Sequence, residues 1–168
     1  MARRKAFVVT ALTVVAGCTP MAPPETPVAT ASLVNRNGAA IGTVRLFSEP
    51  TGAVLRIDAS GLPPGQHGVH LHMTGRCDAP GFTTAGGHWN PTQKQHGHLN
   101  PAGWHQGDLG NLGVGADGRL VAGLLVPEAT LAQLHDADGT AIVFHANADD
   151  ERTDPSGNSG DRIACAVL

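Results

Sequence analysis

From about residue 33 onwards, hydrophobic residues recur at every second position in short runs, and polar turn residues separate the runs. In the run 41–48, for example, Val44 and Leu46 fall on one face, which is the period of a half-buried β-strand. The turn signals Asn37-Gly38 and Asp117-Gly118 lie between such runs. The pattern predicts strands within residues 34–35, 41–48, 54–59, 68–73, 112–114, 120–126, 141–145 and 163–168.

The same pattern indicates a single all-β domain. Only residues 128–134 suggest a short helix, and the 22 glycines argue against a helical fold. About eight short strands with regular turns predict an antiparallel β-sandwich or β-barrel. The segments 74–107 and 146–161 carry no strand pattern, and loops of that length inside a compact domain are usually functional or disordered. We expect metal and a disulfide to order both, since they contain or flank most of the candidate metal ligands and the cysteines Cys77 and Cys165.

The first 17 residues are expected to form a signal peptide (1–17). A basic start, Arg3-Arg4-Lys5, precedes the apolar stretch 6–16, which is too short to span a bilayer as an anchor. The stretch ends in Val15-Ala16-Gly17-Cys18, which resembles the lipobox of bacterial lipoproteins, so we expect export, cleavage before Cys18 and lipid attachment to that residue. An ordinary secretory signal, with Cys18 incidental, is the alternative. Residues 18–30, with four prolines, are predicted to form a flexible tether to a domain at 31–168.

Cysteine count and charge narrow the classes of function. Three cysteines is an odd number for an exported protein. If Cys18 carries lipid, Cys77 and Cys165 remain as a disulfide pair, with metal ligation as their alternative role. The net charge of −3 becomes −6 without the signal peptide, because eight basic residues then face 14 acidic ones. No basic run remains, which argues against nucleic acid as a partner.

Seven side chains with metal-binding chemistry stand at characteristic spacings: His70, His72, His88, His96, His105, Asp108 and, further on, His145. Imidazole is a common ligand for zinc and copper, and residues i and i+2 of a strand share a face, so His70 and His72 can hold one ion together. Seven donors exceed the needs of one four-coordinate ion, and two such ions need eight. One imidazole that uses both ring nitrogens would complete the set, and a water molecule in the eighth position is the alternative. The sequence therefore predicts two metal ions.

Four motifs resemble those of the copper/zinc superoxide dismutase family. They are Gly68-Val69-His70-Leu71-His72, Ala85-Gly86-Gly87-His88-Trp89-Asn90-Pro91, His105-Gln106-Gly107-Asp108-Leu109-Gly110 and Gly157-Asn158-Ser159-Gly160-Asp161-Arg162-Ile163-Ala164-Cys165. The resemblance extends from about Leu33 to Leu168. It implies a flattened Greek-key β-barrel, also described as a sandwich, with two long ordered loops.

Carried over to these positions, the resemblance implies a copper site formed by His70, His72, His88 and His145. It implies a zinc site formed by His88, His96, His105 and Asp108, with His88 bridging the two ions. Asp149 is expected to link a copper histidine to a zinc histidine through hydrogen bonds. Arg162 is expected to attract and orient an anionic substrate beside copper. His67, which directly precedes the first motif, is expected to be structural and to bond backbone groups between loops.

The activity that the resemblance implies is the disproportionation of superoxide to oxygen and hydrogen peroxide, by alternate reduction and oxidation of copper. In that activity zinc is structural, and His88 also donates a proton. The alternative, from another class, is a non-catalytic protein that holds copper or zinc in the cell envelope. We expect a membrane-anchored lipoprotein that faces the periplasm or the cell exterior. The sequence is compatible with a monomer and with a homodimer.

Overall fold

The alternation of apolar and polar side chains produces eight β-strands in the computed structural model, which describes residues 26–168. The strands are β1 (Ala29–Asn35), β2 (Ala40–Glu49), β3 (Gly52–Ser60), β4 (Gly65–His72), β5 (Asp108–Val114), β6 (Arg119–Pro127), β7 (Ala141–His145) and β8 (Arg162–Val167). The predicted signal peptide, Cys18 and the start of the predicted tether lie outside the described residues. Strand β1 begins at Ala29, two residues before the predicted domain boundary.

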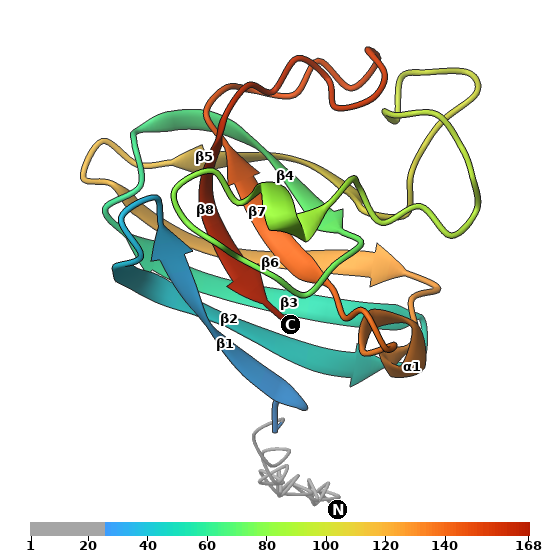
Figure 1. Cartoon of the computed structure of the whole chain (residues 1–168), viewed down its shortest axis with the longest axis horizontal. Helices are drawn as coiled ribbons and strands as arrows, with labels where there is room; N and C mark the ends of the chain where they lie inside the picture. The colour runs from blue at the N-terminus through green and yellow to red at the C-terminus, as the bar shows by residue number, and fades with distance from the viewer. Residues whose placement is uncertain (1–25) are drawn as a thin grey trace, which may run out of the picture.

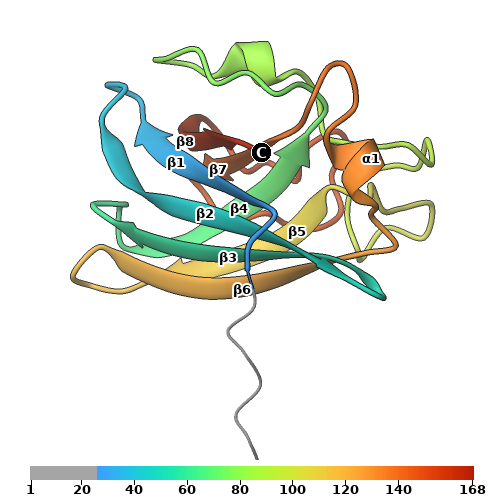
Figure 2. The ribbon, with the colours of Figure 1, turned by 90° about the horizontal axis from the view of Figure 1, so that it is seen from below.

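The strands are antiparallel and pair in the order β5-β4-β7-β8-β1-β2-β3-β6. Strand β5 also contacts β6, so the sheet curls into a nearly closed barrel (Figures 1 and 2). The connections from β3 to β4 and from β6 to β7 each cross to a strand that is not a neighbour, which is the Greek-key arrangement. The prediction of an all-β, Greek-key barrel of about eight strands is confirmed.

Inward-facing residues fill the barrel and hold the strands in register. Val44 and Leu46 of β2 stand opposite Ile57 and Leu55 of β3, and all four side chains are buried. Burial of one such side chain contributes roughly 1.5–3 kcal/mol to folding. Because a shift of one residue would turn these side chains toward solvent, the apolar pattern also fixes the register of the strands.

Three elements differ most from the expectation. Strand β1 begins at Ala29 rather than at residue 34, because pairing with β2 holds this segment extended. Strand β5 begins at Asp108 rather than at residue 112, because pairing with β4 holds the polar, glycine-containing start of β5 extended, with a bulge between Gly68 and His70 on the partner strand. The helix is confined to α1 (Leu131–Leu134), where Thr130 caps the N-terminus in a capping box with Gln133. Within residues 26–168 no helix is long and apolar enough to cross a membrane.

The two long loops lie together at one side of the barrel (Figure 1). The first connects β4 to β5 and contains only the short 3-10 turn Thr83–Ala85, and the second connects β7 to β8. A backbone hydrogen bond joins the two loops directly: the amide of Leu99 donates to the carbonyl of Glu151 at 2.9 Å. No strand is expected in residues 74–107 or 146–161, and the structure contains none in either segment.

Candidate metal centre

Strands β4 and β7 present three histidines on the outer face of the barrel. In β4, Leu71 points into the core while His70 and His72 point outward, as the two-residue period of a strand requires. Antiparallel pairing places His70 opposite Val143 of β7, and His145 follows two positions later on the same face. His70, His72 and His145 are all buried, because the long loops cover this face.

The first long loop brings His88 to these three histidines through its backbone. His72 and His88 form an isolated β-bridge, and the amide of Met73 donates to the carbonyl of Gly87 at 3.0 Å. The ring of His88 then lies with its centroid 4.0 Å from that of His70. The first long loop, which contains no strand, is thus fixed at His88, the residue that the family resemblance predicts to be shared by the two metal ions.

Four imidazole nitrogens converge on one point. His70 Nδ1, His72 Nε2, His88 Nε2 and His145 Nε2 are buried and have no hydrogen-bond partner among the described residues. These four histidines, which we call the first group, offer ligand atoms that all lie within 4.8 Å of one another. A buried polar atom without a partner costs roughly 1–3 kcal/mol, so four such atoms at one point indicate a binding site for a cation.

The second nitrogen of each of these rings is held by a different part of the chain. Its partners are Asp149 Oδ2 at 2.6 Å for His70, the Gly86 carbonyl at 2.9 Å for His72, and the Gly160 carbonyl at 3.1 Å for His145. These acceptors require an N–H on the bonded nitrogen, which leaves a lone pair on the other one. The hydrogen bonds therefore orient the free lone pairs toward a shared metal ion.

A second group of donors surrounds one oxygen of Asp108. Asp108 Oδ1 lies 2.8 Å from His88 Nδ1, 3.0 Å from His96 Nδ1 and 3.1 Å from His105 Nδ1. The Nδ1 atoms of His88 and His105 are 3.3 Å apart. A tetrahedral ion with bonds of about 2.0–2.1 Å holds its donors about 3.3–3.4 Å apart. The distance between the two Nδ1 atoms fits such an ion, while the three distances to Asp108 Oδ1 are shorter because hydrogen bonds join these atoms.

His88 and Asp108 also come within 4.8 Å of His70 and His96 in a combination that omits His105. His70 is not a member of the second group, because its Nε2 is occupied by Asp149 and its Nδ1 faces the first group. The contacts of His105 with Asp108 and His88 place it there instead. His88 is thus the residue that presents one nitrogen to each group.

Asp149 connects the two groups from behind. Its Oδ2 accepts from His70 Nε2 at 2.6 Å and its Oδ1 accepts from His96 Nε2 at 3.0 Å. Asn111 of β5 fixes this residue, since its side chain exchanges hydrogen bonds of 2.9 and 2.7 Å with the carbonyl and amide of Asp149. One carboxylate therefore orients an imidazole of each group, as the family resemblance implies.

Burial keeps the first group neutral. Desolvation lowers the pKa of His70 to about 3, that of His72 to about 2 and that of His145 to about 4. It also lowers the pKa of His88, against the opposing effect of the hydrogen bond to Asp108. Neutral imidazole is the form that binds metal, so protons compete weakly for these four lone pairs at neutral pH.

His96 behaves in the opposite way. Burial alone would lower its pKa, but hydrogen bonds and attraction to Asp108 and Asp149 outweigh this effect and raise the pKa to about 9. Burial acts to raise the pKa values of both carboxyl groups, but hydrogen bonds from His88 and His96 to Asp108, and from His70 and His96 to Asp149, hold them well below their usual range. In the metal-free protein at neutral pH, a protonated His96 therefore lies between two carboxylates.

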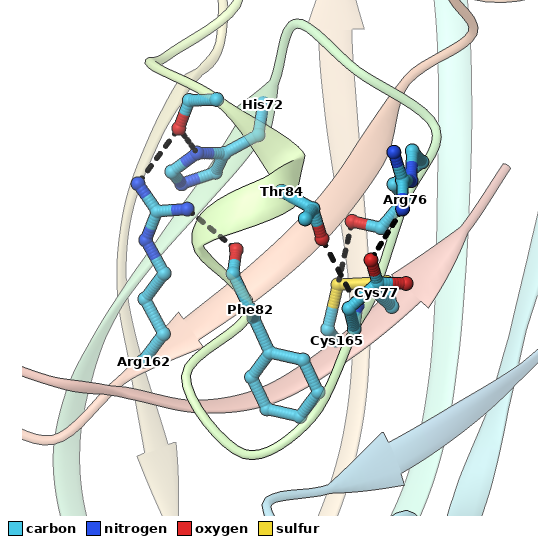
Figure 3. The surroundings of a disulfide bond; sticks show 9 residues. His72, Arg76, Cys77, Phe82, Thr84, Arg162 and Cys165 are labelled. Atoms are coloured by element: carbon cyan, nitrogen blue, oxygen red, sulfur yellow. Dashed lines mark hydrogen bonds and ion pairs between the residues drawn. A yellow bond between two sulfur atoms is a disulfide. The ribbon is translucent and has the colours of Figure 1, made fainter.

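Arg162 lies at the start of β8, close enough to His72 of the first group for its charge to help burial lower the pKa of that histidine. Its Nη1 donates to the Phe82 carbonyl and its Nη2 donates to the Gly86 carbonyl, both at 2.7 Å (Figure 3). The predicted disulfide between Cys77 and Cys165 is confirmed, with a Cα–Cα distance of 5.7 Å. This bond ties the loop that carries both carbonyls to the strand that carries Arg162.

His67 is close to the site but is not one of its donors. Its Nδ1 lies 2.7 Å from the carbonyl of His145 and its Nε2 lies 2.8 Å from the carbonyl of Pro63. Both ring nitrogens are therefore occupied by backbone oxygens, as expected for a structural histidine.

Some residues that shape the site give no signal in the sequence. Asp154 accepts from the amide of His96 at 2.7 Å and so joins the two long loops, and Asn111 holds Asp149 as described above. Gly157 lies against the bond between Asp149 and His96, where an added Cβ would stand 1.7 Å from Asp149 Oδ1. Its φ of 62° also favours glycine. The motif around Gly157 is visible in the sequence, but its contact is not, because it depends on how the loops meet.

Comparisons with known proteins agree in sequence and structure. A family model described as copper/zinc superoxide dismutase (SODC) matches residues 40–168. The Cu-Zn superoxide dismutase 1 of Aquifex aeolicus is 41% identical over 144 residues, which cover 82% of this chain and 85% of that protein. The superoxide dismutase-like protein YojM of Bacillus subtilis is 41% identical over 175 aligned positions, which cover 92% of this chain and 89% of that protein.

Solved structures show the same relationship. A SOD-like protein from Bacillus subtilis superposes with a TM-score of 0.80 at 43% identity, over 83% of this chain and 97% of that one. The Cu/Zn superoxide dismutase from Brucella abortus gives a TM-score of 0.69 at 29% identity, over 83% of this chain and 98% of that one.

Replacement of Gly157 tests the role of the bond between Asp149 and His96. The Gly157→Ala change should separate these side chains and weaken Zn²⁺ binding about 10- to 100-fold, because outer partners of metal ligands contribute that much to affinity. Competition with a chromophoric chelator measures the affinity. Gly123→Ala is the matched control, since an added Cβ there meets no atom within 4 Å. Equal Zn²⁺ affinity in the two variants would contradict the prediction.

Proposed function

Because the chain belongs to the copper/zinc superoxide dismutase family, we propose that it disproportionates superoxide to oxygen and hydrogen peroxide. The observation that carries this proposal is the convergence of four unpartnered imidazole nitrogens beside a second donor group that shares His88. Arg162 supplies a cation close to the first group, because its Nη2 and His72 Nδ1 donate to the same carbonyl, that of Gly86. A metal-binding group alone would serve storage, whereas the added cation suits an anionic substrate.

The two groups differ in the metal that they suit. We assign copper to His70, His72, His88 and His145, since an all-imidazole set suits copper and keeps its donors neutral. We assign zinc to His88, His96, His105 and Asp108, because three imidazole nitrogens gathered around one carboxylate oxygen form a mixed donor set that suits zinc. Copper bound there would supply one-electron redox chemistry with two successive superoxide anions, while zinc has none and would fix His88 and the loops.

The protein's own side chains provide substrate binding and protons in this proposal. The guanidinium of Arg162 attracts and orients the anion, and its two carbonyl partners keep it in place. The ring of His88 stays anchored through Nδ1 in the second group, so its Nε2, when it is not bonded to metal, can hold one of the two protons that the departing peroxide requires and pass it on without reorientation of the ring. The second proton comes from water. Burial around Nε2 excludes competing hydrogen-bond partners.

We propose the following processing and location for the chain. Residues 1–17 direct export, Cys18 receives lipid, residues 18–30 form a tether, and residues 31–168 form the catalytic domain outside the cytoplasmic membrane. The disulfide between Cys77 and Cys165 supports export, since such bonds persist in oxidising compartments. The protein would then face the periplasm or the cell exterior, attached to the membrane through Cys18. The catalytic groups described above all come from one chain, so both a monomer and a homodimer are compatible with this arrangement.

Assay of the protein loaded with copper and zinc tests the proposed activity. Wild-type protein should remove superoxide, and His145→Ala should reduce the rate by more than about 100-fold, because it deletes a donor rather than an outer partner. His135→Ala, which removes an exposed histidine, should have no effect. Absence of superoxide removal in fully loaded wild-type protein would contradict the proposal and favour a non-catalytic metal-binding protein.

Proton release on metal binding tests the assignment of the second group. His96, with a pKa of about 9, is protonated at pH 7 in the metal-free protein and must lose its proton to bind zinc. Zinc binding should therefore release about one proton at pH 7 and fewer as the pH rises through 9. Calorimetry in buffers of different ionisation enthalpy measures this number. Asp149→Asn should lower it by weakening one carboxylate contact of His96. Release of no proton at pH 7 in the wild type would contradict the assignment.

A further inference from the structure

The two carbonyls that hold Arg162 belong to the two ends of one 3-10 turn. The turn spans Thr83–Ala85, with Phe82 immediately before it and Gly86 immediately after it. The two Nη atoms of the Arg162 guanidinium donate to the carbonyl oxygens of these flanking residues, at 2.7 Å each (Figure 3). The position of Arg162 therefore depends on where this turn lies, and not on a side chain that it contacts.

The same turn also orients a histidine of the first group. The Gly86 carbonyl accepts from His72 Nδ1 at 2.9 Å in addition to Arg162 Nη2. Displacement of the turn would thus move the substrate-binding cation and release one imidazole together. The Ala85 carbonyl and the Thr84 hydroxyl of the turn accept hydrogen bonds from the amides of Thr74 and Asp78 in the same loop. A further anchor attaches the turn to the sheet.

The ring of Phe82 is that anchor. It is fully buried in an apolar cluster separate from the barrel core, formed by Phe82, Ala85, Ala141, Val143 and Cys165. Ala141 and Val143 belong to the outer face of β7, the same face from which His145 projects. Phe82 is by far the largest member of this cluster, so its ring makes most of the contact between the turn and the sheet.

The backbone of Phe82 adopts an unusual conformation. Its φ of 52° and ψ of 24° lie in the left-handed region, which residues with a side chain seldom adopt. Its amide donates to the carbonyl of Asp78 at 2.9 Å. The disulfide fixes Cys77, five residues earlier, and burial of the ring attaches the loop to the sheet a second time at position 82.

We propose that Phe82 is a positioning residue for superoxide removal, because its buried ring fixes the turn whose carbonyls aim Arg162. The role of Arg162 in this inference rests on the proposed function, whereas the anchoring of its guanidinium does not. Phe82 touches neither substrate nor metal. Its effect on the reaction passes entirely through Arg162 and, more weakly, through His72.

A double-mutant cycle tests this dependence. Phe82→Ala should lower kcat/KM about 10-fold, mainly through KM, since misplacement of a binding group by about 1 Å costs up to about 100-fold. In an Arg162→Gln background the same change should lower kcat/KM less than about twofold. Phe82→Leu, which keeps most of the apolar volume, should restore most of the activity and guards against failure of the alanine variant to fold. Phe47→Ala, which removes a buried ring of β2, is the control and should retain kcat/KM.

Nuclear magnetic resonance of the guanidinium groups in zinc-loaded, copper-free protein provides a readout without catalysis. Arg162 Nη protons should exchange slowly in the wild type and in Phe47→Ala, and rapidly in Phe82→Ala. Slow exchange in Phe82→Ala, an equal loss of kcat/KM in Phe47→Ala, or additive losses in the Arg162→Gln background would overturn the proposal. If the loaded wild type removes no superoxide, the proposed function fails, and the exchange rates alone decide whether Phe82 positions Arg162.

Discussion

The structure depends on the requirement that buried imidazole nitrogens find partners. Each histidine of the first group has one nitrogen bonded to the protein and one aimed at a common point. The acceptors come from separate places in the chain, namely Asp149 and Gly160 in the second loop and Gly86 in the first. These hydrogen bonds determine which ring nitrogen carries the lone pair. The metal-binding geometry therefore depends on the arrangement of the loops that carry the acceptors. His88 extends this coupling, since its two nitrogens belong to different groups.

The long loops therefore owe their order to polar contacts on the outside of a conventional apolar barrel. Asp149, Asp154 and the disulfide join loop to loop or loop to strand at points far apart in sequence. Glycines permit the closest approaches: an added Cβ at Gly97 would stand 2.1 Å from the carbonyl of Glu151. The small cluster around Phe82 and the ring of Trp89, which packs into the barrel core, give the first loop its apolar burial. Metal affinity, loop order and substrate binding should consequently change together when one of these contacts is lost.

The sequence predicts the parts of this arrangement that have a local pattern. Two-residue alternation locates the strands, and it also places His70 and His72 on one face. The count of seven donors indicates that one imidazole is shared, and family motifs identify His88 as that residue. The start of β5 is not visible, because pairing with β4 imposes extended structure on a polar segment that contains Gly110. The roles of Asn111 and Asp154 are not visible either, since they arise only where the second loop meets a strand or a loop that is distant in sequence.

The central claim is that one imidazole serves two different metal ions. The most direct test is a crystal structure of the protein loaded with copper and zinc, with anomalous diffraction recorded at both absorption edges. We expect copper to be bonded to His88 Nε2 together with His70, His72 and His145. We expect zinc to be bonded to His88 Nδ1 together with His96, His105 and Asp108. A single ion in the site, or two ions of which only one contacts His88, would contradict it.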